Sequence, residues 1–414
     1  MTTLETMGAA AKKAARVLMN AGAKKDEALL KIAEALRANA QTIIEANDID
    51  IENGKAAGLS ASLLDRLKLD EGRIIGMAQG VEQVAAQPDP IGRIIEGRTL
   101  KNGLQIEKIT VPMGVIGIIY EARPNVTSDA AALCLKAGSA VILRGGKEAI
   151  RSNQAIAEIM RDAIEAAGLP RDCVALVGDT TRQSATELMQ LSDYLDVLIP
   201  RGGAGLIKSV VENAKVSVIE TGVGNCHVYV DASADVDMAA SIIFNAKTSR
   251  PSVCNAIETV LVHKDIAEKA LPAIKAELDK KNVELRGCER TRAILGDCVV
   301  PATENDYAIE FLDFILAVKV VDSLDDALDH LAKYSTGHSE SIITSDYAAA
   351  NKFTACVDSA AVYVNASTRF TDGGEFGLGA EIGISTQKLH ARGPMGLGEL
   401  TSMKFIIKGS GQIR

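Results

Sequence analysis

The sequence predicts an α/β protein with a parallel, doubly wound sheet of Rossmann type and a second α/β domain. Five short apolar segments between residues 115 and 219 alternate with segments of helical periodicity, which is typical of a buried parallel sheet covered by helices on both faces. A second series of the same kind extends from residue 227 to 364. A chain of 414 residues is also too long for one hydrophobic core.

The chain begins with a helical region and continues into a predicted hairpin. Apolar residues recur at helical spacing between residues 4 and 87, and Pro88-Asp89-Pro90 ends this region. Residues 98–111 alternate apolar and polar and contain Asn102-Gly103, a dipeptide suited to a tight turn. The segment 402–407 again has strand character and is expected to pair with this hairpin. Because the hairpin has few local partners, we expect an arm for contact between subunits.

The remaining elements follow from apolar runs and helical periodicity. In the first series, strands are expected at residues 115–119, 140–143, 174–177, 196–199 and 216–219, and helices at 128–137, 153–167, 182–191 and 204–214. In the second series, strands are expected at 227–230, 257–262, 315–321, 339–343 and 360–364, with a helix at 235–247. The segment 366–402 has eight glycines and few apolar residues, which predicts a long functional loop.

The composition favours a protein that acts on a small molecule. The net charge is −9, acidic and basic residues are interleaved, and tryptophan is absent, so we expect no nucleic-acid partner and no membrane association. No apolar run approaches the length of a membrane span. The seven cysteines show neither a CxxC pair nor a Cys/His metal spacing, which predicts a reduced, cytoplasmic protein without a metal site.

Cys254 is the main candidate for chemistry. It follows the first strand and helix of the second series, and Glu220 lies shortly before that strand. A thiol in this place can form an acyl-enzyme while a nicotinamide cofactor transfers hydride. The alternative is that an unpaired cysteine is a small buried apolar residue, and Cys254 alone would favour that interpretation.

Two loops at the carboxyl ends of predicted strands are candidates for holding a phosphate-bearing cofactor. Gly202 and Gly203 follow the fourth strand and open a helix, so backbone N–H groups and a helix N-terminus can face an anion. Arg144 and Lys147 follow the second strand. Together their charges suit the 2′-phosphate of NADPH, whereas a solvated basic turn is the alternative.

The segment that follows the first strand contains Arg123 and Asn125. These side chains suit an anionic substrate or a developing oxyanion. The alternative is that Asn125 and Thr127 cap the following helix.

These residues together resemble the aldehyde dehydrogenase superfamily, and within it the members that reduce an acyl phosphate. The resemblance covers essentially the whole chain. It is carried by the segments Tyr120-Glu121-Ala122-Arg123-Pro124-Asn125-Val126-Thr127, Ser252-Val253-Cys254-Asn255-Ala256, His330-Leu331-Ala332-Lys333-Tyr334-Ser335-Thr336-Gly337-His338-Ser339-Glu340 and Gly393-Pro394-Met395-Gly396-Leu397-Gly398-Glu399-Leu400-Thr401. The implied division is an NADP-binding domain of residues 1–97 and 112–226, a catalytic domain of residues 227–400, and an oligomerisation arm of residues 98–111 and 401–414.

The resemblance implies roles for individual residues. Cys254 matches the nucleophile, Glu220 matches the general base of the hydrolytic members, and Glu310 matches the acid that holds the nicotinamide ribose. Gly202 and Gly203 match the turn that lies against the cofactor pyrophosphate.

Cofactor preference and substrate binding follow from the same resemblance. Arg144 stands where the superfamily usually has lysine, and Lys147 stands where NAD-preferring members often have an acid, which favours NADPH. The usual oxyanion asparagine has no identical counterpart, because Ala122 falls nearest its place and Asn125 is only a substitute. The remaining candidates for binding the substrate anion are Arg123, His338 and Arg369.

The implied reaction is the NADPH-dependent reduction of L-glutamyl 5-phosphate to L-glutamate 5-semialdehyde, the second step of proline biosynthesis from glutamate. Cys254, made a thiolate by the positive charge of Arg250 or Lys247, attacks the acyl carbon and expels phosphate, and the thioester then takes up hydride. Because phosphate leaves without a strong base, Glu220 matters less than in a hydrolytic relative. A separate glutamate 5-kinase is an expected partner, and the arm predicts a homo-oligomer.

Two other functions stay open on the sequence. A hydrolytic NAD(P)-dependent aldehyde dehydrogenase would also carry Glu220, and the dependence of aldehyde oxidation on phosphate would distinguish it. A non-catalytic binding or redox-sensing protein would keep the same fold, although the presence of Cys254, Glu310, Gly202 and Gly203 argues against it.

Overall fold

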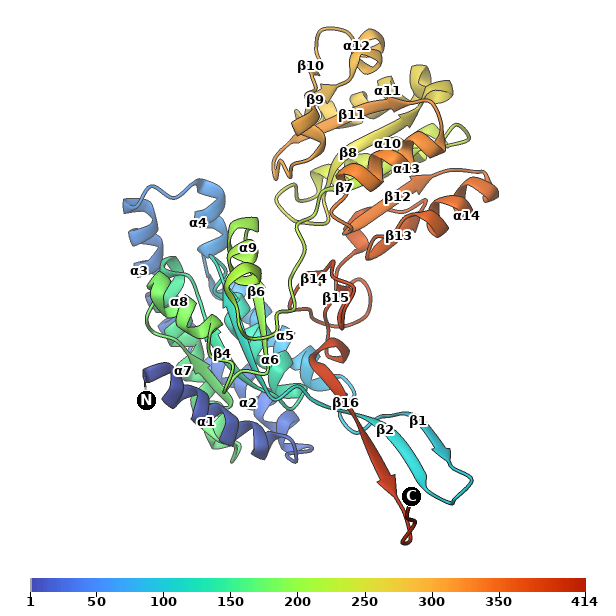
Figure 1. Cartoon of the computed structure of the whole chain (residues 1–414). Coiled ribbons are helices and arrows are strands. Elements are labelled where there is room, and N and C mark those ends of the chain that lie inside the picture. The colour runs from blue at the N-terminus through green and yellow to red at the C-terminus, as the bar shows by residue number, and fades with distance from the viewer. Residues whose placement is uncertain (1) are drawn as a thin grey trace. The chain divides into compact units, whose positions relative to one another are not determined.

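The computed structural model describes residues 2–414, which form two compact units (Figure 1). Unit 1 contains residues 2–221, 377–383 and 395–414, and unit 2 contains residues 222–376 and 384–394. The boundary between Thr221 and Gly222 lies close to the expected one after residue 226. The return of residues 377–383 and 395–400 to unit 1 was not expected from the sequence pattern.

Helices α1 to α5 of unit 1 make up the helical region that the sequence predicted. They span Thr3–Leu18, Lys24–Ala38, Ala40–Ala56, Ala61–Leu67 and Glu71–Ala86. The start of α1 is a capping box, in which Thr2 accepts from the Glu5 amide and Glu5 accepts from the Thr2 amide. Asp70 caps α5 in a similar way through the Arg73 amide.

The parallel sheet of unit 1 has the strand order β5-β4-β3-β6. Its strands are β3 (Val115–Tyr120), β4 (Ala140–Arg144), β5 (Val174–Leu176) and β6 (Val197–Arg201), and its helices are α6 (Asn125–Lys136), α7 (Ile150–Ala166), α8 (Arg182–Met189) and α9 (Ala204–Asn213). Every residue of β3 and β4 is buried, which explains their continuous apolar sequence.

The expected strand at residues 216–219 is wrong. This segment forms only an isolated bridge between Val218 and Leu198. Leu198 exchanges two hydrogen bonds with it, to the Ser217 carbonyl at 2.8 Å and from the Ile219 amide at 3.0 Å, and the chain then leaves the sheet edge. Apolar side chains occur in this segment because it is partly buried, although it does not pair as an extended strand.

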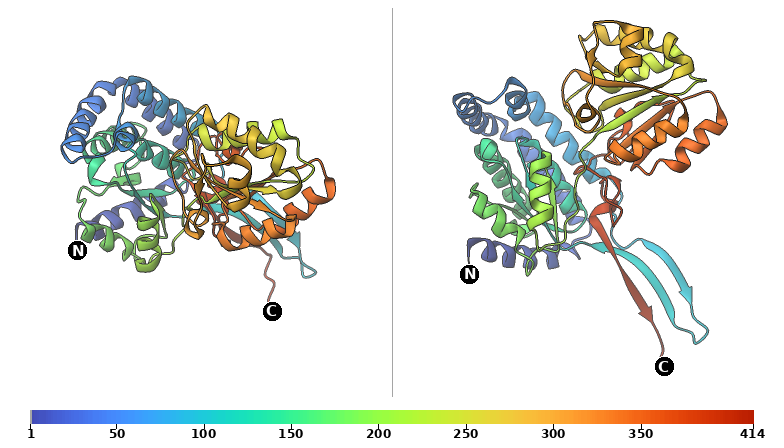
Figure 2. Two further views of the ribbon diagram at one scale, coloured as in Figure 1. Left: turned by 90° about the horizontal axis from the view of Figure 1, so that it is seen from above. Right: turned by 45° about the horizontal axis from the view of Figure 1, so that its top comes forward.

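The predicted arm is a three-stranded antiparallel sheet in unit 1 (Figures 1 and 2). Strands β1 (Ile94–Thr99) and β2 (Gln105–Pro112) form the hairpin, and β16 (Thr401–Lys408) pairs with β2 over its whole length. Gly103 has φ +87°, a left-handed conformation that favours glycine in the turn. The hairpin and its pairing with the C-terminal strand are confirmed.

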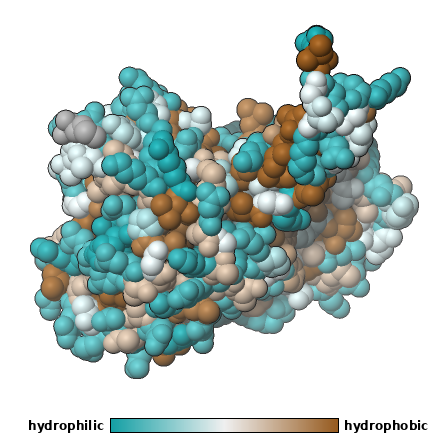
Figure 3. Space-filling view, turned by 90° about the horizontal axis from the view of Figure 1, so that it is seen from below, coloured by the Kyte–Doolittle hydropathy of each residue, from teal (hydrophilic) through white to brown (hydrophobic). Residues whose placement is uncertain are grey.

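Apolar side chains of the arm face solvent. Met403, Phe405 and Ile407 on β16 are each more than half exposed, at 54%, 53% and 56%. Figure 3 shows hydrophobic residues along the projecting arm. A surface of this kind is typical of an interaction site rather than of an unpartnered face.

Unit 2 contains a parallel sheet with the order β10-β9-β11-β8-β7-β12-β13 (Figure 1). Its strands are β7 (Cys226–Val230), β8 (Ile257–His263), β9 (Glu284–Gly287), β10 (Val300–Pro301), β11 (Ile315–Val321), β12 (Ser339–Ile343) and β13 (Ala361–Val364), and its helices are α10 (Val236–Thr248), α11 (Lys264–Asp279), α12 (Glu289–Leu295), α13 (Leu324–Tyr334) and α14 (Tyr347–Cys356). Strand β9 was missed because it is short and carries polar residues, and β10 was missed because it has only two residues. The core lies between α10, α11 and the centre of the sheet.

The expected long loop at residues 366–402 has little regular structure. It contains two-residue strands β14 (Ile384–Ser385) and β15 (Gly393–Pro394), which pair with each other, and short 3-10 turns. Within residues 2–414, no helix has both the length and the apolar character needed to cross a membrane.

Candidate active site

Cys254 lies in the loop 249–256, which joins the end of α10 to the start of β8 in unit 2. Its side chain is partly exposed. The Cys254 carbonyl accepts a hydrogen bond from Cys226 Sγ at 3.1 Å, and a Cβ added to Gly224 would lie 1.6 Å from the same carbonyl oxygen. The backbone of Cys254 is therefore packed tightly, while the residue as a whole is partly exposed.

Asn255 and Arg369 fasten this loop to the segment 367–371. The Asn255 amide donates to the carbonyls of Arg369 and Thr371 at 3.3 and 2.9 Å, and the Arg369 guanidinium donates to Asn255 Oδ1 and, at 3.0 Å, to Ser249 Oγ. The Arg369 charge also interacts electrostatically with Cys254. A cation beside a thiol favours the thiolate.

The expectation that Lys247 supplies this charge is wrong. Lys247 Nζ lies 2.6 Å from Glu258 Oε2, and neither side chain is exposed. Burial lowers the pKa of Lys247, while the Glu258 charge acts in the opposite direction. Arg369, which the sequence pattern had suggested only for substrate binding, is a cation whose charge acts on Cys254, and the expectation for Arg250 stays a prediction.

Glu310 holds a main-chain group next to the Cys254 loop. Its Oε1 accepts a hydrogen bond from the Gly224 amide at 2.6 Å. Burial raises the pKa of Glu310, and this hydrogen bond partly offsets the effect. Gly224 is the residue that packs on the Cys254 carbonyl, so Glu310 and Cys254 belong to one cluster.

His338 lies inside unit 2 with no exposed surface. Its Nδ1 is 2.8 Å from Ser339 Oγ and 3.6 Å from Cys226 Sγ. Ser339 Oγ in turn lies 2.7 Å from Thr371 Oγ1. These contacts give His338 a packing role behind Cys226, contrary to the expected contact with substrate.

A cavity of about 840 Å³ in unit 1 contains two of the residues expected to hold a cofactor, Arg144 and Lys147. It is lined by the ends of β4 and α9 and by α8, and the charged groups in its wall are Glu121, Arg144, Lys147, Glu148 and Arg182. Arg182 was missed because a basic residue at the start of a helix gives no signal by itself.

Arg144 and Lys147 have different surroundings in this cavity. Arg144 Nη2 donates to the carbonyls of Thr180 and Thr181 at 2.7 and 2.9 Å, so the guanidinium is held by the neighbouring loop. Burial lowers the pKa of Arg144, and nearby carboxylates raise it. Lys147 is exposed and is able to move toward a ligand.

Gly202 and Gly203 form the turn between β6 and α9, as expected. The Gly203 amide donates to Glu121 Oε2 at 3.1 Å, so a main-chain N–H of this turn already holds an anionic group. A Cβ on Gly202 would lie 2.5 Å from the same oxygen. The turn therefore fits a phosphate in the place that Glu121 takes.

Asn125 begins α6, and Pro124 is the N-cap residue. Neither Asn125 nor Thr127 caps the helix, so that alternative is wrong. The Asn125 amide donates to Asp129 Oδ2 at 2.9 Å. Burial raises the pKa of Asp129 to about 6, and the hydrogen bond from Asn125 lowers it.

The other two predicted residues of unit 1 lie near the ends of its strands. Arg123 is half-buried in the turn between β3 and α6, and Glu220 is half-buried next to Thr221, the last residue before unit 2. Thr221 Oγ1 donates to the Pro200 carbonyl at 2.9 Å, which fixes the chain after Glu220 on the end of β6.

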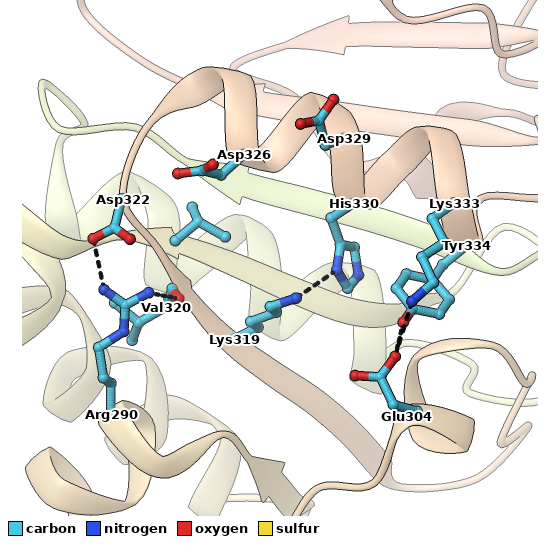
Figure 4. Close-up of a pocket in the computed structure, with 11 residues that line it drawn as sticks. Arg290, Glu304, Lys319, Val320, Asp322, Asp326, Asp329, His330, Lys333 and Tyr334 are labelled. Carbon is cyan, nitrogen blue, oxygen red and sulfur yellow. Dashed lines mark hydrogen bonds and ion pairs between the residues drawn. The ribbon is translucent and has the colours of Figure 1, made fainter.

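A second cavity, of about 340 Å³, lies in unit 2 and contains none of the predicted residues (Figure 4). Burial, together with the charges of Lys319 and neighbouring groups, lowers the pKa of His330 to about 2. Lys319 Nζ lies 3.4 Å from His330 Nδ1, while Arg290 and Lys333 pair with acids in the wall.

Among residues 2–414, no group of three or more His, Cys, Asp or Glu is arranged to hold a metal ion.

Comparison with known sequences identifies close relatives. A sequence model of the aldehyde dehydrogenase family matches residues 2–292. The chain is 60% identical over 412 residues to the gamma-glutamyl phosphate reductase of Moorella thermoacetica, covering 99% of this chain and 98% of that protein. The enzyme of the same name from Clostridium novyi is also 60% identical, over 99% of this chain and 98% of that protein.

Solved structures agree with these sequence matches. The crystal structure of gamma-glutamyl phosphate reductase from Thermotoga maritima has 50% identity and a TM-score of 0.97, with all of both chains covered. An acetylating aldehyde dehydrogenase from Geobacillus thermoglucosidasius has 20% identity and a TM-score of 0.70, over 99% of this chain and 97% of that one. The second likeness concerns the fold alone.

Proposed function

The chain belongs to the aldehyde dehydrogenase family, and we propose how its residues carry out the reaction that the names of the relatives above describe. It reduces L-glutamyl phosphate to L-glutamate semialdehyde, a step of proline biosynthesis, with a pyridine nucleotide as the hydride donor. Our finer proposal is that Cys254 forms a thioester during this reaction and that NADPH is the preferred nucleotide.

The observation that carries the proposal is the surroundings of Cys254. Cys254 is partly exposed and interacts electrostatically with Arg369. Its carbonyl contacts Cys226 and Gly224, and the neighbouring Asn255 fastens the loop. The Arg369 charge stabilises the thiolate, which attacks the acyl carbon of L-glutamyl 5-phosphate and forms the S–C bond. The bond from that carbon to phosphate oxygen breaks, and phosphate leaves as an anion. The Cys254 amide is the proposed donor to the oxyanion.

The residues of unit 1 fit a dinucleotide phosphate. When bound, NADPH supplies the hydride that reduces the thioester. The Gly203 amide, at the N-terminus of α9, is the proposed donor to its pyrophosphate, since it already binds a carboxylate. Arg144 and Lys147, with Arg182 as an addition, supply positive charge for a 2′-phosphate. Glu310 of unit 2 is proposed to hold the nicotinamide ribose.

The remaining assignments are proposals of smaller reach. Asn125, oriented by Asp129, and Arg123 are candidates to bind the substrate. Phosphate departs without a base, so Glu220 is expected to matter less than Cys254. The exposed apolar side chains of β16 support an arm that joins a homo-oligomer. A separate glutamate 5-kinase is the proposed source of the labile acyl phosphate.

The test runs the reaction in reverse. Purified protein is incubated with L-glutamate 5-semialdehyde and NADP⁺, with and without phosphate, and NADPH absorbance is followed. Cys254→Ser is compared with Cys298→Ser, which changes an exposed cysteine. We expect phosphate-dependent NADPH formation in the wild type and Cys298→Ser, and a loss of about 1,000-fold or more in Cys254→Ser.

Each other outcome has a definite meaning. Oxidation that needs Cys254 but is indifferent to phosphate would indicate a hydrolytic aldehyde dehydrogenase. Full activity of Cys254→Ser would overturn the proposal that Cys254 forms a thioester. An equal rate with NAD⁺ would overturn the nucleotide preference while leaving the chemistry intact.

A further inference from the structure

The buried ion pair of unit 2 brackets the loop that carries Cys254. Lys247 lies near the end of α10 and Glu258 near the start of β8, and the loop 249–256 runs between them. Lys247 Nζ and Glu258 Oε2 are 2.6 Å apart, and both side chains are fully buried. The pair therefore ties together the two ends of the nucleophile loop.

The second oxygen of the same carboxylate holds another segment. Glu258 Oε1 accepts a hydrogen bond from the Leu312 amide at 3.2 Å. Leu312 has φ +56°, a left-handed conformation that a branched side chain rarely adopts. Such a conformation persists when its surroundings hold it in place. Leu312 follows Glu310 by two residues, so Glu258 supports the turn on which Glu310 stands.

The contacts close into a ring around Cys254. Glu258 holds Leu312, Glu310 accepts from the Gly224 amide at 2.6 Å, and Gly224 packs against the Cys254 carbonyl. Phe311, between Glu310 and Leu312, lies under the Lys247 ammonium, which is 6.0 Å from the ring centroid. One carboxylate thus connects the nucleophile loop to the segment of Glu310.

Stability alone is a poor explanation for this pair. Removing two charges from water is costly, and apolar residues of similar volume often replace a buried ion pair without loss of stability. The presence of two charges at this place is explained if their directed hydrogen bonds determine the positions of other groups.

We propose that Glu258, held by Lys247, is a positioning residue that keeps Cys254 and Glu310 in register for catalysis. This inference rests on the proposed roles of Cys254 and Glu310. Neither Glu258 nor Lys247 touches the reacting atoms. Their effect reaches the reaction through the Cys254 loop and the Leu312 turn.

The test compares two double variants that both remove the ion pair. In Lys247→Met with Glu258→Met, the pair becomes apolar and the acceptor for Leu312 is lost. In Lys247→Met with Glu258→Gln, the side-chain carbonyl can still accept from the Leu312 amide. The matched control is Lys352→Ala with Asp325→Ala, which removes an exposed ion pair of unit 2. Thermal unfolding shows whether each variant is folded.

We expect the Met/Met variant to fold and to lose about 10- to 100-fold in kcat, with the KM for semialdehyde and nucleotide within about twofold. The rate of Cys254 alkylation by iodoacetamide should change as well. The Met/Gln variant should recover most of kcat, and the surface control should match the wild type. If Met/Met does not fold, Lys247→Met with Glu258→Leu provides the same comparison.

Three results would overturn the proposal. A folded Met/Met variant with wild-type kcat would exclude a positioning role. Equal losses in Met/Met and Met/Gln would show that the Leu312 hydrogen bond is irrelevant. A uniform rise in KM with unchanged kcat and alkylation would indicate weaker binding instead. Failure of the proposed function is recognised separately, because Cys254 alkylation is measured without any substrate.

Discussion

The two parallel sheets of this chain hold their functional groups by different means. In unit 1, the group that meets an anion is the main-chain amide of Gly203 at the start of α9, and the neighbouring Gly202 leaves no room for a side chain. In unit 2, the loop that carries Cys254 is fastened by the side chains of Asn255 and Arg369. A site made of main chain is damaged by adding atoms, whereas a site made of side chains is damaged by removing them.

The largest effect is expected from removing a side chain in unit 2. Asn255→Ala loses the hydrogen bonds to the Thr371 and Arg369 carbonyls and the acceptor for the Arg369 guanidinium. We expect kcat to fall about 100-fold, because the Cys254 loop and its cation are no longer held in position. Initial rates measure this loss, and Asn351→Ala on the exposed side of α14 is the control. A wild-type rate in Asn255→Ala would show that catalysis does not depend on these side-chain contacts of the Cys254 loop.

A smaller effect is expected from adding one carbon in unit 1. In Gly202→Ala, the new Cβ would approach Glu121 Oε2 to 2.5 Å and Leu206 Cδ2 to 2.8 Å. We expect the KM for the nucleotide to rise about 10- to 100-fold. The turn must shift to relieve the overlap, and such overpacking costs about 1–3 kcal/mol. Gly76→Ala is the matched control, since a Cβ there meets no atom within 4 Å. An unchanged KM in Gly202→Ala would show that the turn is not a binding surface.

Removing a side chain in unit 1 should have a still smaller effect. Lys147 is exposed, and an exposed charge contact is worth up to about 1 kcal/mol. Lys147→Ala should therefore reduce kcat/KM for NADPH about fivefold and leave the value for NADH unchanged. Lys208→Ala, which removes an exposed lysine of α9, serves as the control. Equal losses with both nucleotides would mean that Lys147 does not contact the 2′-phosphate.

The smallest effect on activity is expected at Asp129, where the change appears in stability. The folded-state pKa of about 6 lies above the ordinary value of 3.8 because of burial. Between about pH 4 and pH 6, Asp129 therefore keeps its proton in the folded state and has lost it in the unfolded state. The contribution of Asp129 to stability falls as pH rises through this range.

Asp129→Asn should remove this dependence and still accept a hydrogen bond from Asn125. Urea unfolding of the variant and the wild type at pH 5 and pH 8 gives the difference in unfolding free energy. We expect the variant to gain about 1 kcal/mol or more relative to the wild type between pH 5 and pH 8. A difference that does not vary with pH would show that Asp129 is charged in the folded protein throughout this range.

Local pattern was sufficient for much of the fold. Strands β3 and β4 are almost entirely apolar, apart from Arg144 at the end of β4, because both faces of their sheet are covered. Asn102-Gly103 predicted the arm hairpin because Gly103 takes a left-handed conformation. Burial was mistaken for strand pairing at residues 216–219, and the opposite error left out β9, whose polar residues hide its place in the sheet.

The candidate site divides in the same way. Residue type and position beside predicted strands led to Cys254, Gly202, Gly203 and Arg144 as candidates, and their roles stay predictions. They were insufficient for Lys247, whose charge is taken by Glu258 across the nucleophile loop. They also suggested that His338 binds the substrate, which its complete burial contradicts.

The α/β class, the arm and the family could be predicted from the amino-acid sequence, because periodicity and motifs are properties of neighbouring residues. The interaction of Arg369 with Cys254, and the carboxylate that joins the Cys254 loop to Glu310, could be found only in the folded chain. Arg369, Cys254, Glu258 and Leu312 are brought together by packing of segments far apart in the chain. Charge pairing and burial depend on those distances, and no pattern of adjacent residues contains them.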